Sequence, residues 1–147
     1  MADTDTMRID LEWKGGSGYS VATPSGATLA LDSTAKAGAS PMETLLAALA
    51  GCMAIDVVLI LKRMRNSPDR LLASVRGARA DDHPRRFVRI RLDFTAVGGA
   101  TTPDRLERSV QLSFDKYCSV LHSLAPDTAF RWSARITTDP SASGEGA

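Results

Sequence analysis

The two cysteines of the chain, Cys52 and Cys118, are the side chains with the widest range of chemistry. Thiols form disulfides and attack peroxides, and in both reactions the thiolate is the reactive form. Cys52 lies in a long apolar stretch, where a free cysteine most often packs as a small hydrophobic side chain. Cys118 follows Asp115 and Lys116 at the predicted start of a short helix, and helix N-terminal amides and a nearby lysine both favour thiolate. Their separation of 66 residues leaves open whether the two thiols meet.

Few other reactive side chains lie near these thiols in the sequence. Asp56 lies one helical turn after Cys52, and because a carboxylate raises the pKa of a neighbouring thiol, we interpret Asp56 as a buried structural carboxylate with its own partner. His122 lies four residues after Cys118, the spacing of a nucleophile and base on one helix face, although cysteine hydrolases usually take their histidine from elsewhere in the chain. A zinc site that combines both cysteines with His83 and His122 lacks the ligand spacing of zinc proteins.

The segment 40–65, SPMETLLAALAGCMAIDVVLILKRMR, carries Cys52 and predicts the central element of the fold. Ser40 suits the N-cap, Pro41 suits the first helical position, and Glu43 completes a capping box. A helix that is apolar all round is a buried helix, so we expect a long core helix. A membrane span is disfavoured because a single carboxylate would lie deep in the apolar segment.

Alternating apolar and polar residues predict strands before and after this helix. The resulting order is βββ-α-ββ-α-β, and hairpin-like connections predict an α+β fold with antiparallel sheets packed around the central helix. One sheet cannot cover so apolar a helix, so we expect an obligate homodimer in which a partner subunit covers the other side. The predicted strands are 7–13, 19–22, 27–31, 71–80, 86–96 and 130–136, with a second helix from 102 and a short helical turn over 117–124.

Length and composition predict a single domain of 147 residues with flexible tails at 1–6 and 139–147. Hydrophobic residues make up 44% and charged residues 24%, as in soluble globular proteins. The net charge of +1 gives no indication of nucleic acid or an anionic membrane as a partner. The polar, acidic N-terminus does not resemble a signal peptide, which predicts a cytoplasmic location where cysteines are more often reduced, catalytic or redox-active than in structural disulfides.

The segments SPMETLLAALAGCMAIDVV and DKYCSVLHSL together resemble the OsmC/Ohr family, the osmotically inducible protein C and organic hydroperoxide resistance proteins. The resemblance extends from Arg8 to about Thr138. It implies an intertwined homodimer with two long central helices between sheets and active sites at the interface. By position, Cys52 matches the peroxidatic cysteine of the family and Cys118 the resolving cysteine. The implied substrates are small organic hydroperoxides, including those of lipids, and the implied reductant is an external thiol, with neither metal nor cofactor.

The chain departs from the peroxidases of this family at the residues that activate the thiolate. Those enzymes carry an arginine in the glycine-rich turn after the first strand, whereas the turn here has Lys14, which cannot offer a bidentate fork. Their glutamate precedes the cysteine by ten residues. Glu43 precedes Cys52 by nine, which places it on the opposite helix face about 13 Å along the axis. Lys14, Glu43 and Asp56 are therefore candidates for supporting roles in a divergent subgroup.

Two functions from different classes fit these residues. The first is thiol-dependent reduction of organic hydroperoxides in oxidative-stress defence, with Cys52 as nucleophile and Cys118 as resolver. The second is a non-catalytic OsmC-like protein that binds a small apolar ligand or senses redox state. A cysteine hydrolase built on Cys118 and His122 is a more distant alternative.

Overall fold

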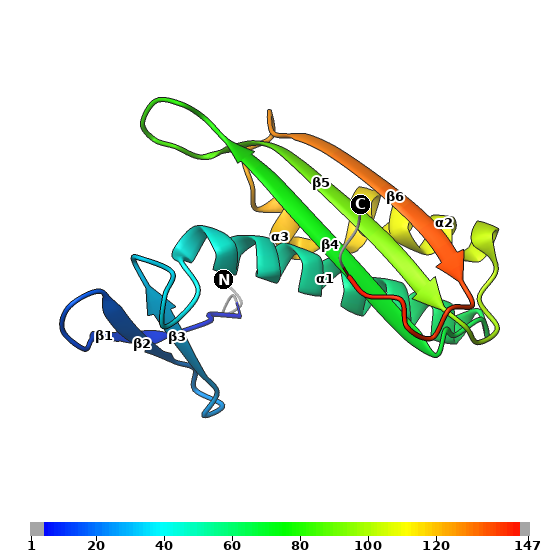
Figure 1. Cartoon of the computed structure of the whole chain (residues 1–147), viewed down its shortest axis with the longest axis horizontal. Helices are drawn as coiled ribbons and strands as arrows, with labels where there is room; N and C mark the ends of the chain where they lie inside the picture. The colour runs from blue at the N-terminus through cyan, green and yellow to red at the C-terminus, as the bar shows by residue number, and fades with distance from the viewer. Residues whose placement is uncertain (1–4, 145–147) are drawn as a thin grey trace. The chain divides into compact units, whose positions relative to one another are not determined.

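The computed structural model describes residues 5–144, and the chain forms two compact units that divide between Leu45 and Leu46. The division falls near the start of the long helix α1 (Pro41–Arg63) (Figure 1). The single domain inferred from length therefore stays a prediction. The predicted tails lie partly outside the described residues, at 1–4 and 145–147. In the predicted C-terminal tail, the carbonyls of Pro140 (2.9 Å) and Ala142 (3.3 Å) accept hydrogen bonds from the Arg70 guanidinium.

The first unit is an antiparallel meander of three short strands. Gly15 and Gly16, with φ of 91° and 56°, make the turn between the first two, because glycine adopts the left-handed region without steric cost. Leu11 and Trp13 alternate with polar residues as predicted, but they are 56% and 62% exposed in the chain. The strands are β1 (Asp10–Trp13), β2 (Gly18–Ala22) and β3 (Thr28–Asp32).

The second unit contains a three-stranded sheet in the order β4-β5-β6, which is mixed and not wholly antiparallel. β4 (Arg70–Arg79) pairs antiparallel with β5 (Phe87–Val97), but β5 pairs parallel with β6 (Ala129–Thr137). The prediction of purely antiparallel sheets is wrong at this pair. The physical reason is that parallel neighbours require a crossover, which the helical segments between β5 and β6 supply. These segments are α2 (Pro103–Leu112), the π-helical turn η1 (Ser113–Tyr117) and α3 (Ser119–His122).

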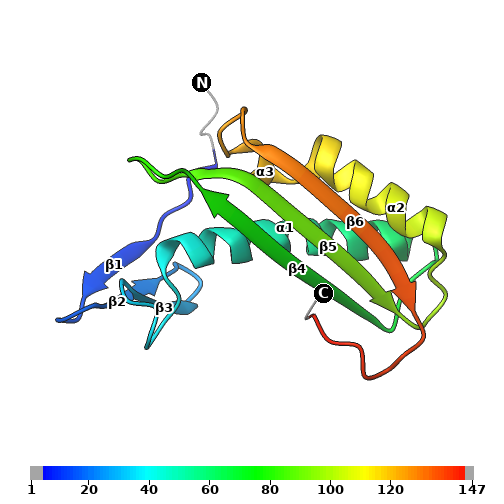
Figure 2. The same ribbon diagram turned by 45° about the horizontal axis from the view of Figure 1, so that its top comes forward.

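The core lies between one face of this sheet and the helices, which are on the same side of it in both ribbon views (Figures 1 and 2). Alternate residues of β5, represented by Leu92 and Phe94, are fully buried. The core residues of α1 fall four apart and form a single stripe, because such residues share a helix face. This stripe consists of Leu49, Met53, Val57 and Leu61.

The opposite face of α1 is apolar and exposed, with Ile55 at 62% and Leu59 at 50%. The predicted helix is therefore present, but the described chain buries one of its faces and not its whole circumference. By length and composition, α1 is long and apolar enough to cross a membrane. That is weak evidence for a span, since the core helix of a soluble protein passes the same test.

Candidate thiol active site

The fold brings Cys52 and Cys118 together, from the middle of α1 and from the junction of η1 with α3. The two thiols are near enough that Cys52 contributes to the raised pKa of Cys118. Cys118 is fully buried, whereas Cys52 is partly exposed. The pair therefore combines an accessible thiol with an enclosed one.

Local backbone geometry positions the thiol of Cys118. The π-helical turn closes with a 2.9 Å hydrogen bond from the Cys118 amide to the Ser113 carbonyl. Cys118 then takes an extended conformation, φ −72° and ψ 100°, as the N-cap of α3. Its Sγ accepts a 3.3 Å hydrogen bond from the amide of Leu121. Single π turns inside helices are frequent at functional sites, and here the turn directs a cysteine toward α1.

Burial raises the pKa of the Cys118 thiol to about 11, against an ordinary value of 9.0. The amide of Leu121 opposes this shift, while the adjoining Cys52 and the charge of Asp56 add to it. The expectation that helix amides and Lys116 favour a thiolate at Cys118 is wrong, because desolvation outweighs one backbone donor. The ammonium of Lys116 lies instead 5.3 Å from the ring centroid of the adjoining tyrosine. Cys118 is consequently a protonated thiol at neutral pH.

Asp56 is a half-buried carboxylate with a hydrogen-bond partner, as the sequence led us to expect. Ser113 Oγ donates a hydrogen bond of 2.8 Å to Asp56 Oδ2. Ser113 is itself fully buried, and its carbonyl accepts the amide of Cys118. Sequence reasoning missed Ser113, although it follows the apolar positions Leu106 and Val110 of α2 at helical spacing, where a small polar residue needs a partner.

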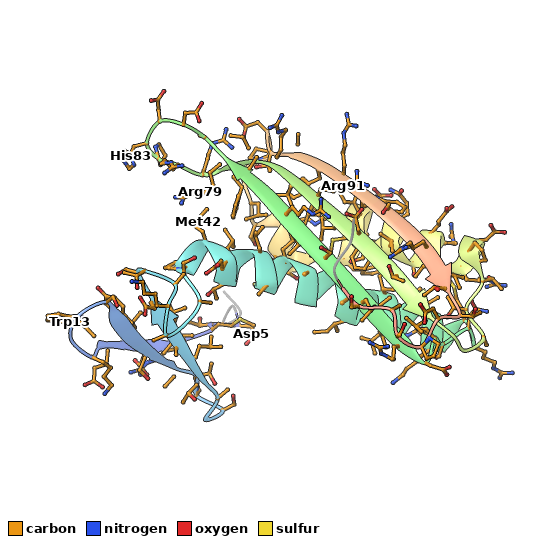
Figure 3. All side chains as sticks on the ribbon, in the orientation of Figure 1. Asp5, Trp13, Met42, Arg79, His83 and Arg91 are labelled. Carbon is orange, nitrogen blue, oxygen red and sulfur yellow. The ribbon has the colours of Figure 1, made fainter. Side chains whose placement is uncertain are left out.

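His122 contacts the backbone of Cys118 and not its thiol. Its Nδ1 lies 2.8 Å from the carbonyl oxygen of Cys118, while the thiol takes its hydrogen bond from a backbone amide. The geometry therefore gives no support to a Cys118–His122 hydrolase dyad. His83 is exposed in the turn between β4 and β5 (Figure 3). Over residues 5–144, no group of three or more histidine, cysteine or acidic side chains is arranged to hold a metal ion.

Two apolar surfaces lie near the thiols. The first is the outward face of α1, where Ile55 follows Cys52 by three residues and therefore neighbours it on the helix surface. The second is a pocket of about 430 Å³ beside α3, lined by Leu121 and by the edge-to-face rings of Phe114 and Phe130. Neither cysteine lines this pocket, although Leu121 contacts the thiol of Cys118 through its amide.

The remaining supporting candidates belong to the first unit. The ammonium of Lys14 pairs with Glu12 at 2.7 Å on the exposed surface. Glu43 forms the predicted capping box, since its carboxylate accepts the Ser40 amide at 2.8 Å and Ser40 Oγ accepts the Glu43 amide at 3.3 Å. The hydrogen bond from the Ser40 amide lowers the pKa of Glu43. Both side chains have local partners, and a supporting role at the thiols stays a prediction.

Comparison with known proteins places the chain in a family. The sequence model of the OsmC-like protein family matches residues 33–133, which is more than half of the chain. The chain belongs to the OsmC-like family. Protein YhfA of Escherichia coli K12 is 35% identical over 115 residues, which cover 78% of this chain and 86% of YhfA. The OsmC/Ohr resemblance seen in the cysteine segments is thereby confirmed.

Solved structures share the fold of this chain. A hypothetical protein from Aquifex aeolicus VF5 superposes with a TM-score of 0.83 at 29% identity, over 91% of this chain and 98% of that one. The organic hydroperoxide resistance protein OhrB of Bacillus subtilis superposes with a TM-score of 0.57 at 12% identity, over 90% and 98% of the two chains. The α+β fold with the predicted element order is confirmed. Family membership also supports a soluble protein in which the apolar α1 is a core helix.

Proposed function

We propose that this OsmC-like protein reduces organic hydroperoxides, with Cys52 as the peroxidatic cysteine and Cys118 as the resolving cysteine. Family membership supports a stress-related redox role. The observation that carries the finer proposal is the proximity of a partly exposed thiol to a fully buried one. On this proposal, a peroxide reaches the exposed thiol first, and the nearby buried thiol then forms the disulfide.

In the first step, the Cys52 thiolate attacks the terminal oxygen of the hydroperoxide and the O–O bond breaks. The alkoxide leaves and takes a proton to become the alcohol, and Cys52 becomes a sulfenic acid. Cys118 is unsuited to this step, because its proton is held with a pKa of about 11 in a buried position. The exposure of Cys52 and the burial and raised pKa of Cys118 thus support the assigned order.

In the second step, the sulfur of Cys118 attacks the sulfenic sulfur of Cys52. The S–O bond breaks, the hydroxide leaves with the thiol proton of Cys118 as water, and the disulfide forms. The two thiols together supply the two electrons that reduce the peroxide. An external thiol reductant then returns two electrons and two protons to restore both cysteines.

This chain lacks the arginine with which the peroxidases of the family activate the thiolate, and its glycine-rich turn has Lys14 instead. This departure favours the second candidate function, a protein that binds a small apolar ligand without turnover. The 430 Å³ pocket lined by Phe114, Leu121 and Phe130 is large enough for such a ligand. A redox-sensing role would use the same two thiols, oxidised without rapid turnover.

We further propose a homodimer, in agreement with the expectation from the sequence. Ile55 and Leu59 expose a large apolar surface on α1, and exposed apolar patches of this kind mark interaction sites. The exposed Leu11 and Trp13 of β1 add apolar surface in the first unit. Burial of these side chains against a second copy would give α1 the environment that its composition indicates.

The deciding experiment measures intact mass and free thiols after one equivalent of cumene hydroperoxide, followed by rapid quench, with hydrogen peroxide in parallel. The chain has two cysteines, so every thiol lost is assigned to this pair. A working couple loses both thiols and about 2 Da within seconds, and it reacts faster with the organic peroxide. Retention of both thiols over minutes would refute the peroxidase and leave the ligand-binding function. A gain of about 16 Da without a disulfide would contradict the role of Cys118.

A further inference from the structure

A row of arginines crosses the second sheet from edge to edge. Arg76 of β4 is the register partner of Arg91 of β5, and Arg91 is the register partner of Arg131 of β6. Register partners lie on the same face of a sheet, so these three side chains are neighbours at the strand spacing of about 4.8 Å. Arg89 lies two residues from Arg91 along β5 and hence on the same face. All four are exposed, and Arg91 marks the middle strand in Figure 3.

The arginine face is the side of the sheet opposite the helices. Ile90 and Leu92, which flank Arg91 in β5, are 2% and 0% exposed and point into the core. Helices α1 to α3 lie on that core side in both ribbon views (Figures 1 and 2). Because successive side chains alternate across a strand, the arginines point the other way, into solvent.

Positive charge is concentrated on this face although the whole chain carries a net charge of +1. Arg70 and Arg135 have the same orientation, and Asp93 is the one acidic side chain among the described outward positions of the three strands. Asp93 is partly buried, which raises its pKa, but hydrogen bonds from Ser133 and Arg91 and the charges of Arg91 and Arg76 lower it overall. Its negative charge is therefore already committed within the face.

Ion pairing differs among the four arginines. Within residues 5–144, neither Arg89 nor Arg131 has a carboxylate oxygen within ion-pair distance, whereas Arg91 pairs with Asp93 at 3.0 Å. Like charges opposite one another on neighbouring strands are unfavourable. A bound anion would neutralise the charges of Arg89 and Arg131 and reduce this repulsion.

The four arginines surround a depression of about 330 Å³. Its floor is open because Ala78 and Ala129, the register partners of Arg89 on the two sides, have short side chains. This volume is at the lower end of the range for small-molecule sites. The planar guanidinium group presents two parallel donors that match phosphate oxygens.

We propose that this depression on the arginine face of the β4–β5–β6 sheet binds a small soluble polyanion with two or more phosphate groups. Arg76, Arg91 and Arg131 extend over two strand spacings, or about 10 Å, which suits several linked phosphates better than one. The site is on a different surface from the thiols and does not depend on their chemistry.

A nucleic-acid strand fits the face less well than a small ligand. Proteins that hold single strands combine basic side chains with aromatic rings on which the bases stack. The aromatic side chains of these three strands all lie on the core side of the sheet. Within the described sheet, the arginine face therefore offers no aromatic ring on which a base could stack. The aromatic residues are Phe87, Phe94, Phe130 and Trp132.

The test is calorimetric titration of the reduced, full-length protein with sodium tripolyphosphate at low ionic strength. We expect one tripolyphosphate per chain and an affinity that falls as salt is added. Arg89→Gln combined with Arg131→Gln should weaken binding at least tenfold. The matched control, Arg63→Gln with Arg105→Gln, removes the same charge from exposed helical positions and should change the affinity less than twofold. Equal melting temperatures establish that all three proteins are folded.

A second variant separates a built site from diffuse attraction. Arg131→Lys keeps the charge but loses the bidentate fork, so it should weaken binding severalfold. Cys52→Ser should bind as wild type does, because the thiols lie elsewhere. The proposal is overturned if tripolyphosphate does not bind at millimolar concentration, or if the control pair weakens binding as much as the site pair. It is also overturned if a 20-nucleotide single strand, or vesicles with anionic phospholipid, bind through these arginines and are not displaced by tripolyphosphate.

Discussion

Asp56 and Ser113 join the two elements that carry the cysteines, through a hydrogen bond of 2.8 Å from Ser113 Oγ to Asp56 Oδ2. Asp56 lies one turn after Cys52 on α1, and the carbonyl of Ser113 accepts the amide of Cys118. A side chain at one thiol thus restrains the backbone at the other. The hydrogen bond fixes the positions of the two cysteine-bearing segments relative to each other. It also accounts for a carboxylate in the apolar middle of α1.

This pairing predicts a measurable stability. Ser113→Ala should lower the free energy of unfolding by about 1–2 kcal/mol, because it removes a charge-assisted hydrogen bond to a half-buried carboxylate. Asp56→Ala should cost about 1–3 kcal/mol, since it leaves the buried Ser113 hydroxyl unpaired. Urea denaturation of both single variants and the double variant measures the coupling. Ser123→Ala, which removes an exposed local bond, is the control, and additive effects of Ser113 and Asp56 would contradict the pairing.

The assigned roles predict that the two cysteine variants differ in kind. Cys52→Ser should abolish peroxide consumption, because the remaining thiol is buried and protonated. Cys118→Ser should still react once, and it should accumulate a sulfenic acid that a dimedone probe traps in stopped-flow and mass measurements. His122→Ala should retain activity, since its ring contacts a backbone carbonyl. If Cys118→Ser is inactive in a single turnover while Cys52→Ser reacts, the roles are reversed.

The raised pKa of Cys118 predicts a pH dependence of stability. The thiol titrates near 11 in the folded chain, against an ordinary value of 9.0. The folded state therefore binds this proton more tightly than the unfolded state does. Its contribution to stability is complete below about pH 9 and is lost as the pH rises toward 11.

Denaturation of the reduced protein across this interval provides the measurement. Wild type should lose more stability between pH 9 and 11 than Cys118→Ser, whose hydroxyl does not titrate there. The difference between the two proteins isolates this group, because lysines and tyrosines are common to both. Parallel curves would show that the thiol is not desolvated.

The exposed face of α1 predicts a homodimer that a single charge disrupts. Ile55→Glu should convert the dimer to a monomer or lower its melting temperature strongly, because a charge in an apolar interface is left unpaired. Lys62→Glu, an exposed charge reversal at the end of the same helix, is the control and should stay dimeric. Light scattering at several concentrations gives the mass, and a monomeric wild type would refute the interface.

Much of the architecture follows from local sequence patterns. The capping residues Ser40 and Glu43 and the apolar run after them determine α1, which begins at Pro41 as predicted. Alternation locates the strands within a few residues of their observed bounds. The two cysteine segments identify the family, because those segments are short and specific. These features depend on neighbours in the chain, and the sequence contains them directly.

The tertiary structure decided what depends on distant contacts. Alternation gives no strand direction, so the parallel pairing of β5 with β6 could not be inferred from it. Sequence neighbours suggested a thiolate at Cys118, yet burial raises its pKa, because desolvation is set by residues far away in the chain. Arginines scattered over three strands form one row because register places Arg76, Arg91 and Arg131 side by side. The local pattern of apolar residues determined the core elements, and the pairing of the strands determined where the charged side chains gather.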